Sequence, residues 1–252
     1  MNAWMKTGSA CAGQYIYCDV PDVECGELAF TQDDFWTAYL PAVHPTAAGH
    51  RYIADRILSV LPDTALSFDD VPEGAWYYMD VAACYYRGLM VGVSDTRFAP
   101  NLPVDRAMVA AIVHRIAGEP AAAGADMPFR DVPSDAYYTQ SVAWAYHAGV
   151  VSGCSADTFC PTQAISRQDL AAILYRYACL AGTVDETQSE DSLSGFADAG
   201  AVSGYARAAL AWAVENGILY GKDGNRLDPK GTATRAECAA LLWRFVSQYS
   251  LA

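Results

Sequence analysis

Three arginines occupy the same unusual position in three related stretches of the sequence. Arg106, Arg167 and Arg235 each follow a residue that is suited to cap the start of a helix. A cation there faces the positive end of the helix dipole, which costs roughly 0.3 to 1 kcal/mol. The repeated unfavourable placement therefore predicts a compensating partner. That partner is either a protein carboxylate in an ion pair, or a bound carboxylate or phosphate held by the guanidinium and by free amides of the helix end.

An aspartate and an aromatic residue precede the arginine in each stretch. The aspartates are the candidates for the ion pair: Asp70, Asp131 and Asp198. The aromatic residues are Trp76, Tyr137 and Tyr205. Such residues either pack inside the fold or stand exposed, where a ring can stack on the face of a sugar. The sequence leaves both pairs of alternatives open, and an aspartate can also orient an arginine that contacts a ligand.

All of these residues belong to three copies of one unit. The opening Phe68-Asp69-Asp70-Val71-Pro72 recurs as Phe129-Arg130-Asp131-Val132-Pro133 and more loosely as Phe196-Ala197-Asp198. Apolar residues at helical spacing then predict a first helix in each copy. A glycine suited to a left-handed C-cap ends that helix: Gly88, Gly149 or Gly217. A turn containing proline follows, and a second helix begins after its candidate N-cap: Asp105, Ser166 or Thr234.

Each unit is therefore a helix, a loop and a helix, with predicted boundaries at 67–118, 128–182 and 195–248. One such pair of helices cannot bury its own apolar face, whereas three pairs packed together can. We predict a mainly α-helical fold in which the three units form a pseudo-threefold bundle.

The units resemble the S-layer-homology (SLH) repeats of bacterial surface proteins. Thr234-Arg235-Ala236-Glu237 matches the family motif most closely, followed by Ser166-Arg167-Gln168-Asp169 and Val104-Asp105-Arg106-Ala107. The resemblance implies non-covalent anchoring to the bacterial cell wall through a secondary cell-wall polysaccharide, or another glycan linked to peptidoglycan. It also implies that acidic, often pyruvylated, sugars bind in grooves between the repeats, where the motif arginine meets the acid.

Residues 1–62 differ from the repeats and resemble the C-terminal end of SGNH (GDSL-type) hydrolases. We expect a small α/β remnant, with loop and short helix over Phe30 to Tyr39. The resemblance implies that His44, which follows this stretch, would be the general base. The chain contains no Gly-Asp-Ser nucleophile motif, and a base without a nucleophile performs no acyl transfer. A non-catalytic chain is therefore expected. The alternative is a carbohydrate esterase or lipase whose catalytic region is truncated here.

Composition limits the partners further. The formal net charge of −13 argues against nucleic acid and against anionic membrane surfaces. No apolar run reaches the length of a transmembrane helix, and no CxxC or Cys/His pattern predicts a metal or a cofactor. Cys154 and Cys160 are close enough in sequence for a local disulfide. Since Met1 to Gly13 lacks signal-peptide character, we expect the chain to begin within a longer secreted protein that lies at the cell surface.

Overall fold

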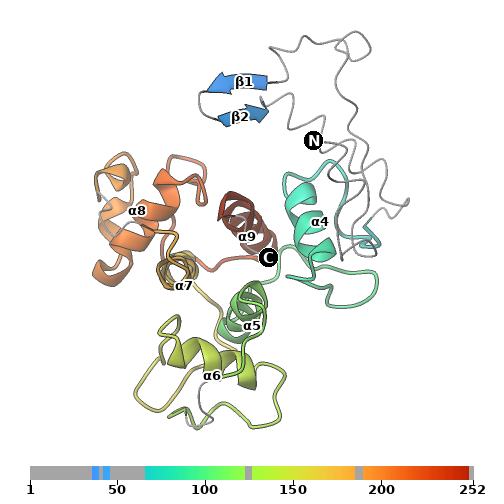
Figure 1. Ribbon diagram of the computed structural model, residues 1–252, viewed down its shortest axis with the longest axis vertical. Helices are drawn as coiled ribbons and strands as arrows, with labels where there is room; N and C mark the ends of the chain where they lie inside the picture. The colour runs from blue at the N-terminus through green and yellow to red at the C-terminus, as the bar shows by residue number, and fades with distance from the viewer. Residues whose placement is uncertain (1–35, 40–41, 46–65, 123–126, 185–189, 250–252) are drawn as a thin grey trace. The chain divides into compact units, whose positions relative to one another are not determined.

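The computed structural model describes residues 36–39, 42–45, 66–122, 127–184 and 190–249 (Figure 1). The chain divides into two compact units, Met1–Ala65 and Leu66–Ala252. The described part of the first unit is an antiparallel hairpin of β1 (Trp36–Tyr39) and β2 (Ala42–Pro45), in which Thr37 pairs with His44. The expected loop and short helix up to Tyr39 is therefore wrong, because aromatic and β-branched residues favour an extended chain there. The other elements predicted within residues 1–62 lie outside the described residues.

The second unit is mainly helical, as predicted. Its α-helices are α4 (Tyr78–Tyr86), α5 (Arg106–Ile116), α6 (Thr139–His147), α7 (Arg167–Leu180), α8 (Arg207–Glu215) and α9 (Arg235–Tyr249). Three short 3-10 turns precede α8: η1 (Glu190–Leu193), η2 (Ala199–Ala201) and η3 (Gly204–Ala206). The first helix of each repeat is thus α4, α6 or α8, and the second helix is α5, α7 or α9.

The helices pair between repeats. The second helix of each repeat packs against the first helix of the next one: α5 against α6, α7 against α8, and α9 against α4. The last of these pairs joins the third repeat to the first, so the arrangement closes on itself. Figure 1 shows the three pairs around a common centre, with α5, α7 and α9 on the inner side.

A ring of backbone hydrogen bonds lies where the second helices begin. The N–H of Val104 donates to the carbonyl of Ala233 at 3.0 Å, Ala233 donates to Ile165 at 3.0 Å, and Ile165 donates back to Val104 at 2.9 Å. All three side chains are buried. Each repeat therefore donates one of these bonds to a second repeat and accepts one from the third, which makes the pseudo-threefold relation part of the backbone itself.

Two glycines in each repeat fix the shape of the loop after the first helix. Gly88 has φ +67°, in the left-handed region that a C-cap requires. Gly92 has a different role, because a Cβ there would lie 2.5 Å from the ring of the opening residue Phe68. The same approach recurs at Gly153 and Gly221. The loop can therefore lie directly on the phenylalanine that begins its own repeat.

Candidate functional site

The start of each second helix is capped by its own side chains. Asp105 accepts a hydrogen bond from the N–H of Met108 at 2.7 Å. Thr234 and Glu237 form a reciprocal capping box, in which the Thr234 hydroxyl accepts from the Glu237 N–H at 3.2 Å and the Glu237 carboxylate accepts from the Thr234 N–H at 3.0 Å. The caps predicted from the sequence are thus confirmed.

The first amides of these helices are occupied by the neighbouring repeat. The backbone N–H of Arg106 donates to Gln163, that of Arg167 to Gly231, and that of Arg235 to Leu102, at 2.8–3.0 Å. The following residue in each helix also donates to a carbonyl of the same neighbouring turn. The expectation of free helix-end amides for an anion is therefore wrong, since the carbonyls of the adjacent repeat already satisfy them.

The arginine side chains reach across the same boundary. The Nε atoms of Arg106, Arg167 and Arg235 donate to the carbonyls of Phe159, Leu227 and Phe98 at 2.9, 2.9 and 2.7 Å. A second guanidinium nitrogen of each donates to a carbonyl in the preceding loop: Ser152, Tyr220 or Val91. The positive charge of each arginine is therefore stabilised first by carbonyl dipoles of the next repeat. Because each arginine links its own helix to that repeat, we call Arg106, Arg167 and Arg235 the clasping arginines.

The three arginines differ in how far their side chains are exposed to solvent. Arg167 is 4% exposed and Arg235 is 7% exposed, whereas Arg106 is half-buried. Burial lowers the pKa of Arg167, and the nearby Glu237 carboxylate opposes that change. The Arg235 guanidinium also lies 4.4 Å from the centroid of the Phe98 ring, a favourable cation–π distance.

The repeated aspartates hold the turns that receive these arginines. Asp70 accepts hydrogen bonds from the backbone N–H groups of Phe98 and Ala99, both at 2.8 Å, and Asp131 and Asp198 do the same in their own repeats. Burial alone would raise the pKa of Asp70, but these N–H groups and Arg97 outweigh it and lower the pKa below its usual value. Ala99 has φ +59°, so the carboxylate stabilises a turn that a residue with a side chain adopts only at a cost.

The predicted ion pair between the motif arginines and these aspartates is wrong within the described part of the chain. Asp70 instead lies 3.7 Å from Arg97, and Asp198 lies 3.9 Å from Arg226, both of them exposed arginines. The physical reason is that the backbone of one residue lies between the two charges. In the first repeat, the N–H of Phe98 binds Asp70 while its carbonyl binds Arg235.

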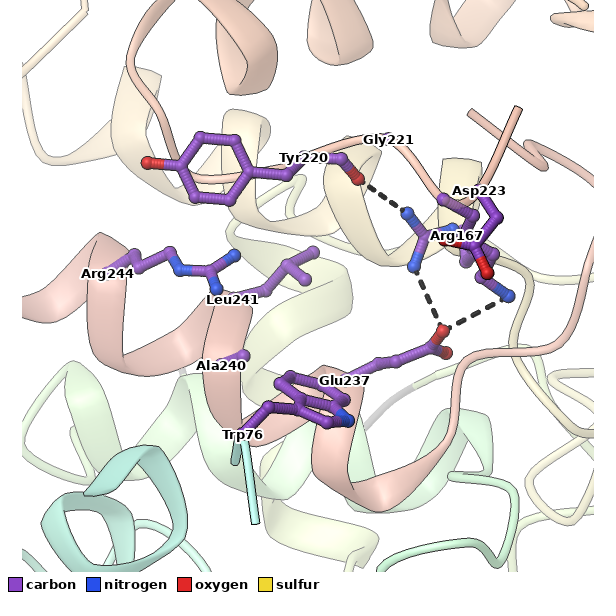
Figure 2. A pocket seen from close by; sticks show the side chains of 10 residues that line it. Trp76, Arg167, Tyr220, Gly221, Asp223, Glu237, Ala240, Leu241 and Arg244 are labelled. Carbon is purple, nitrogen blue, oxygen red and sulfur yellow. Dashed lines mark hydrogen bonds and ion pairs between the residues drawn. The ribbon is translucent and has the colours of Figure 1, made fainter. Parts of the chain in front are cut away.

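A groove opens beside one of the clasps, which we call groove A. It has a volume of about 430 Å³, and Figure 2 shows its lining. The lining residues are Trp76, Arg167, Tyr220, Gly221, Lys222, Asp223, Glu237, Ala240, Leu241 and Arg244. They come from all three repeats, so groove A exists only when the repeats are assembled.

The charged groups of groove A form a connected cluster at one end. An Oε atom of Glu237 lies 3.3 Å from Arg167 Nη1 and 3.1 Å from Lys222 Nζ. Lys222 also contacts Asp228 at 2.9 Å. At the other end the guanidinium of Arg244 lies 4.5 Å from the centroid of the Tyr220 ring (Figure 2).

Exposed aromatic surface completes the groove. Trp76 is 64% exposed and Tyr220 is 60% exposed, which is unusual for large apolar side chains. Tyr137 and Tyr205, the counterparts of Trp76, are 66% and 60% exposed. The alternative in which these repeated aromatic residues are buried in the core is therefore wrong, because they stand outside it. Exposed rings of this kind are suited to stacking on a flat or partly apolar ligand face.

The positions that line groove A have counterparts at the other two boundaries between repeats, and we call these two sets of residues surface B and surface C. Surface B contains Tyr137, Arg235, Val91, Met108 and Arg115. Burial raises the pKa of Tyr137 and Asp105 adds to this, while the nearby Arg115 and Arg235 oppose it. Met108 takes the place of Glu237, and Val91 takes that of Tyr220, so surface B is the most apolar of the three.

Surface C contains Tyr205, Arg106, Ser152, Asp169 and Arg176. The Tyr205 hydroxyl donates to Asp169 at 2.6 Å and accepts from the amide of Gln168 at 3.0 Å. Asp169 also accepts from the Ser166 hydroxyl at 2.6 Å. The acid on this surface is therefore engaged with Tyr205 of the third repeat and with Ser166 of its own repeat, rather than with Arg106.

Comparison with known proteins identifies the repeats. A family model described as "S-layer homology domain" matches residues 67–108, 128–171 and 195–239. The chain belongs to the S-layer homology domain family. The matched segments contain all three aspartates, all three exposed aromatic residues and all three clasping arginines of the SLH repeats. This membership supports a general role in anchoring at the bacterial cell surface.

Curated relatives agree with this assignment. The chain is similar to the surface-layer 125 kDa protein of Lysinibacillus sphaericus, with 34% identity over 164 residues, 63% of this chain and 13% of that protein. It is similar to an amylopullulanase of Thermoanaerobacterium thermosulfurigenes, with 31% identity over 186 residues, 70% of this chain and 9% of that protein. It is also similar to S-layer protein EA1 of Bacillus anthracis, with 28% identity over 189 residues, 74% of this chain and 21% of that protein. The chain thus spans less than a quarter of the length of each of these relatives.

The SLH repeats account for most, but not all, of the candidate residues. Groove A brings together Trp76 and Arg167, two of the candidate residues from the sequence, with Tyr220, Lys222 and Arg244, which were not among the candidates. The SGNH resemblance of residues 1–62 gains no support from the family match, which begins at residue 67. His44 lies in β2, and its side chain is outside the description.

The described residues contain no helix that is both long and apolar enough to cross a membrane. They also contain no cluster of three or more His, Cys, Asp or Glu side chains that could hold a metal ion.

Proposed function

We propose that this SLH triplet anchors its parent protein non-covalently to the cell wall by binding an acidic, pyruvylated secondary cell-wall polysaccharide. The observation that supports this proposal is the meeting, in groove A, of two exposed aromatic side chains with cations from two repeats. An aromatic ring favours the apolar face of a sugar, and a guanidinium favours its carboxylate.

Arg244 is the cation in groove A best placed for a ligand carboxylate. Its guanidinium donates one long hydrogen bond, to the carbonyl of Ile218 at 3.4 Å, rests on the Tyr220 ring and interacts electrostatically with the Asp80 carboxylate. Lys222 and Arg167 are already engaged with Glu237. A ligand acid therefore gains most from Arg244, while Trp76 supplies the surface on which the sugar ring lies.

The repeated arginines, aromatic residues and aspartates have different roles in the proposed glycan binding. Arg106, Arg167 and Arg235 form the base of surface C, groove A and surface B, with Tyr205, Trp76 and Tyr137 at their rims. Asp70, Asp131 and Asp198 fix the turns that these arginines grip. The net charge of −13 makes such local cations necessary, since the rest of the chain repels an anionic glycan. The partner is thus a wall glycan, and the location is the extracellular face of the wall.

A wall-binding assay tests this proposal. The full chain is mixed with purified walls of a Gram-positive bacterium, and the bound fraction is measured by co-sedimentation. Trp76→Ala and Arg244→Ala should each weaken binding about tenfold, because each removes roughly 1–2 kcal/mol of stacking or charged hydrogen bonding. Arg97→Ala is the matched control, since it removes an exposed arginine outside groove A.

The outcomes separate an anchor from a plain scaffold. Walls treated with mild acid, which removes pyruvate ketals, should bind the wild-type chain less well, and the treatment should reduce binding of Arg244→Ala by a smaller factor. Equal binding of all variants to untreated walls, with unchanged stability, would show that groove A is not the glycan site.

A further inference from the structure

Two cysteines face each other across one loop of the second repeat. The Cys154 thiol donates to the carbonyl of Phe159 at 3.3 Å, and that carbonyl belongs to the peptide bond that leads into Cys160. The N–H of Cys154 donates to the carbonyl of Thr158 at 2.8 Å, which folds the loop back on itself. Both thiols are free in the structure, and Cys154 is exposed to solvent. The sulfur of Cys154 therefore lies directly beside the backbone of its partner.

The third repeat shows that these two positions bring side chains into contact. Cys154 follows the second glycine of its repeat, as Lys222 does, and Cys160 is the middle residue of the proline turn, as Asp228 is. Lys222 and Asp228 form an ion pair at 2.9 Å. The same two positions thus carry an electrostatic cross-link in one repeat and two thiols in another.

We propose that Cys154 and Cys160 form a disulfide that cross-links the loop beneath Arg106 when the protein is at the cell surface. A sulfur–sulfur bond forms, and each thiol loses its hydrogen. The two electrons and two protons pass to an organic disulfide, which is reduced to two thiols. The oxidising surroundings of a surface protein favour this product. The exchange proceeds through a mixed disulfide at the exposed Cys154.

The loop that the cross-link would hold is the one that receives Arg106. The carbonyls of Ser152 and Phe159 accept from the Arg106 guanidinium. Ser152 lies two residues before Cys154, and Phe159 lies directly before Cys160. Arg106 is the least buried of the three clasping arginines, and Asp169, the counterpart of Glu237, is engaged with Tyr205. A covalent link therefore holds the loop at the repeat boundary whose clasping arginine is the least buried. Its effect on glycan binding at surface C rests on the proposed function, but the cross-link itself does not.

The reaction should be slow at neutral pH. Burial raises the pKa of the Cys154 thiol to about 11, and its contact with Cys160 adds to the increase. Because the thiolate is the reactive form, oxidation should accelerate as the pH rises from 7 to 9.

Peptide mapping tests the proposal on the full chain. Residues 131–167 form one tryptic peptide that contains Cys154 and Cys160 and no other cysteine. After incubation with oxidised glutathione and alkylation in denaturant, this peptide should be two hydrogens lighter than the reduced form and carry no alkyl group. After reduction it should carry two alkyl groups. Two alkyl groups without reduction, two glutathione adducts, or a link from Cys154 to a different cysteine would each overturn the proposal.

Thermal unfolding provides an independent readout that needs no glycan. The oxidised wild-type chain should unfold about 5 °C above the reduced chain, the effect expected for closing a short loop in a domain of this size. Cys154→Ser should show no such redox-dependent difference. An equal difference in Cys154→Ser would assign the shift to other cysteines. Because wall binding is measured separately, failure here leaves the anchoring proposal untouched.

Discussion

Replacing Arg235 with alanine should destabilise the SLH triplet more than any substitution of an exposed charge. Its guanidinium donates to the carbonyls of Phe98 and Val91 and stacks on the Phe98 ring, across the boundary between the last repeat and the first. Hydrogen bonds that involve a charged group contribute about 1.5–3 kcal/mol each, and a buried cation–π contact contributes about 1–2 kcal/mol. Relief of the unfavourable helix dipole returns at most about 1 kcal/mol. The contributions overlap, so we expect a net loss of about 3 kcal/mol.

Urea unfolding monitored by circular dichroism measures this loss. With a slope of about 2 kcal/mol per molar urea, the midpoint should fall by about 1.5 M while the slope stays unchanged. Arg235→Lys keeps the charge, but its compact ammonium group lacks the planar fork whose two separate nitrogens reach Phe98 and Val91, so it should recover less than half of the loss. Arg97→Ala, an exposed control, should change stability by less than about 0.5 kcal/mol.

Two results would refute this reasoning. A loss below about 1 kcal/mol in Arg235→Ala would mean that the clasp contributes little and that apolar packing alone closes the triplet. Full recovery in Arg235→Lys would mean that the charge matters and the forked hydrogen-bond geometry does not.

Two further predictions concern the turns and the loops. The pKa values of Asp70 and Asp131 are lower in the folded chain than usual, so their contribution to stability is present above about pH 4 and is lost as the pH falls through the folded values. The free energy of unfolding should therefore fall between pH 5 and pH 3, with a shallower slope in Asp131→Asn; an identical slope would contradict the assignment. Gly92→Ala should cost at least about 3 kcal/mol, because the added Cβ would meet the Phe68 ring at 2.5 Å, whereas Gly74→Ala, with open space around it, should cost less than about 1 kcal/mol, as thermal unfolding can check. Equal effects at the two glycines would show that the close approach to Phe68 is not required.

The repeated local features were predictable because they depend on neighbours in sequence. Caps such as Thr234 and the C-cap glycine Gly88 are decided within one turn of helix, and each recurs in three copies. The repeats, the mainly helical class and the family could all be predicted in this way. The partners of Arg235 could not, because its acceptors are backbone carbonyls far away in sequence, and a carbonyl leaves no signature in residue type.

Groove A shows a second limit of sequence reasoning. Tyr220 and Lys222 flank the second glycine of the third repeat, where the other repeats have different residues, so no repetition pointed to them. Arg244 does have counterparts in Arg115 and Arg176, but its position in a late helical turn is explained equally well by the helix dipole. Only the pairing of α9 with α4 brings Trp76 opposite these side chains.

That pairing also decides where mechanical load enters the anchor. A pull on the chain ahead of residue 66 reaches α4 first, and α4 packs against α9, the final helix. Tension from a tethered cargo therefore acts on the junction between the two ends of the triplet, which is held by non-covalent contacts alone within the described residues. In an open array of repeats such a pull would peel off one terminal unit at a time. In this closed arrangement, detaching α4 would open groove A by removing Trp76, so shear resistance and the proposed glycan binding would be lost together.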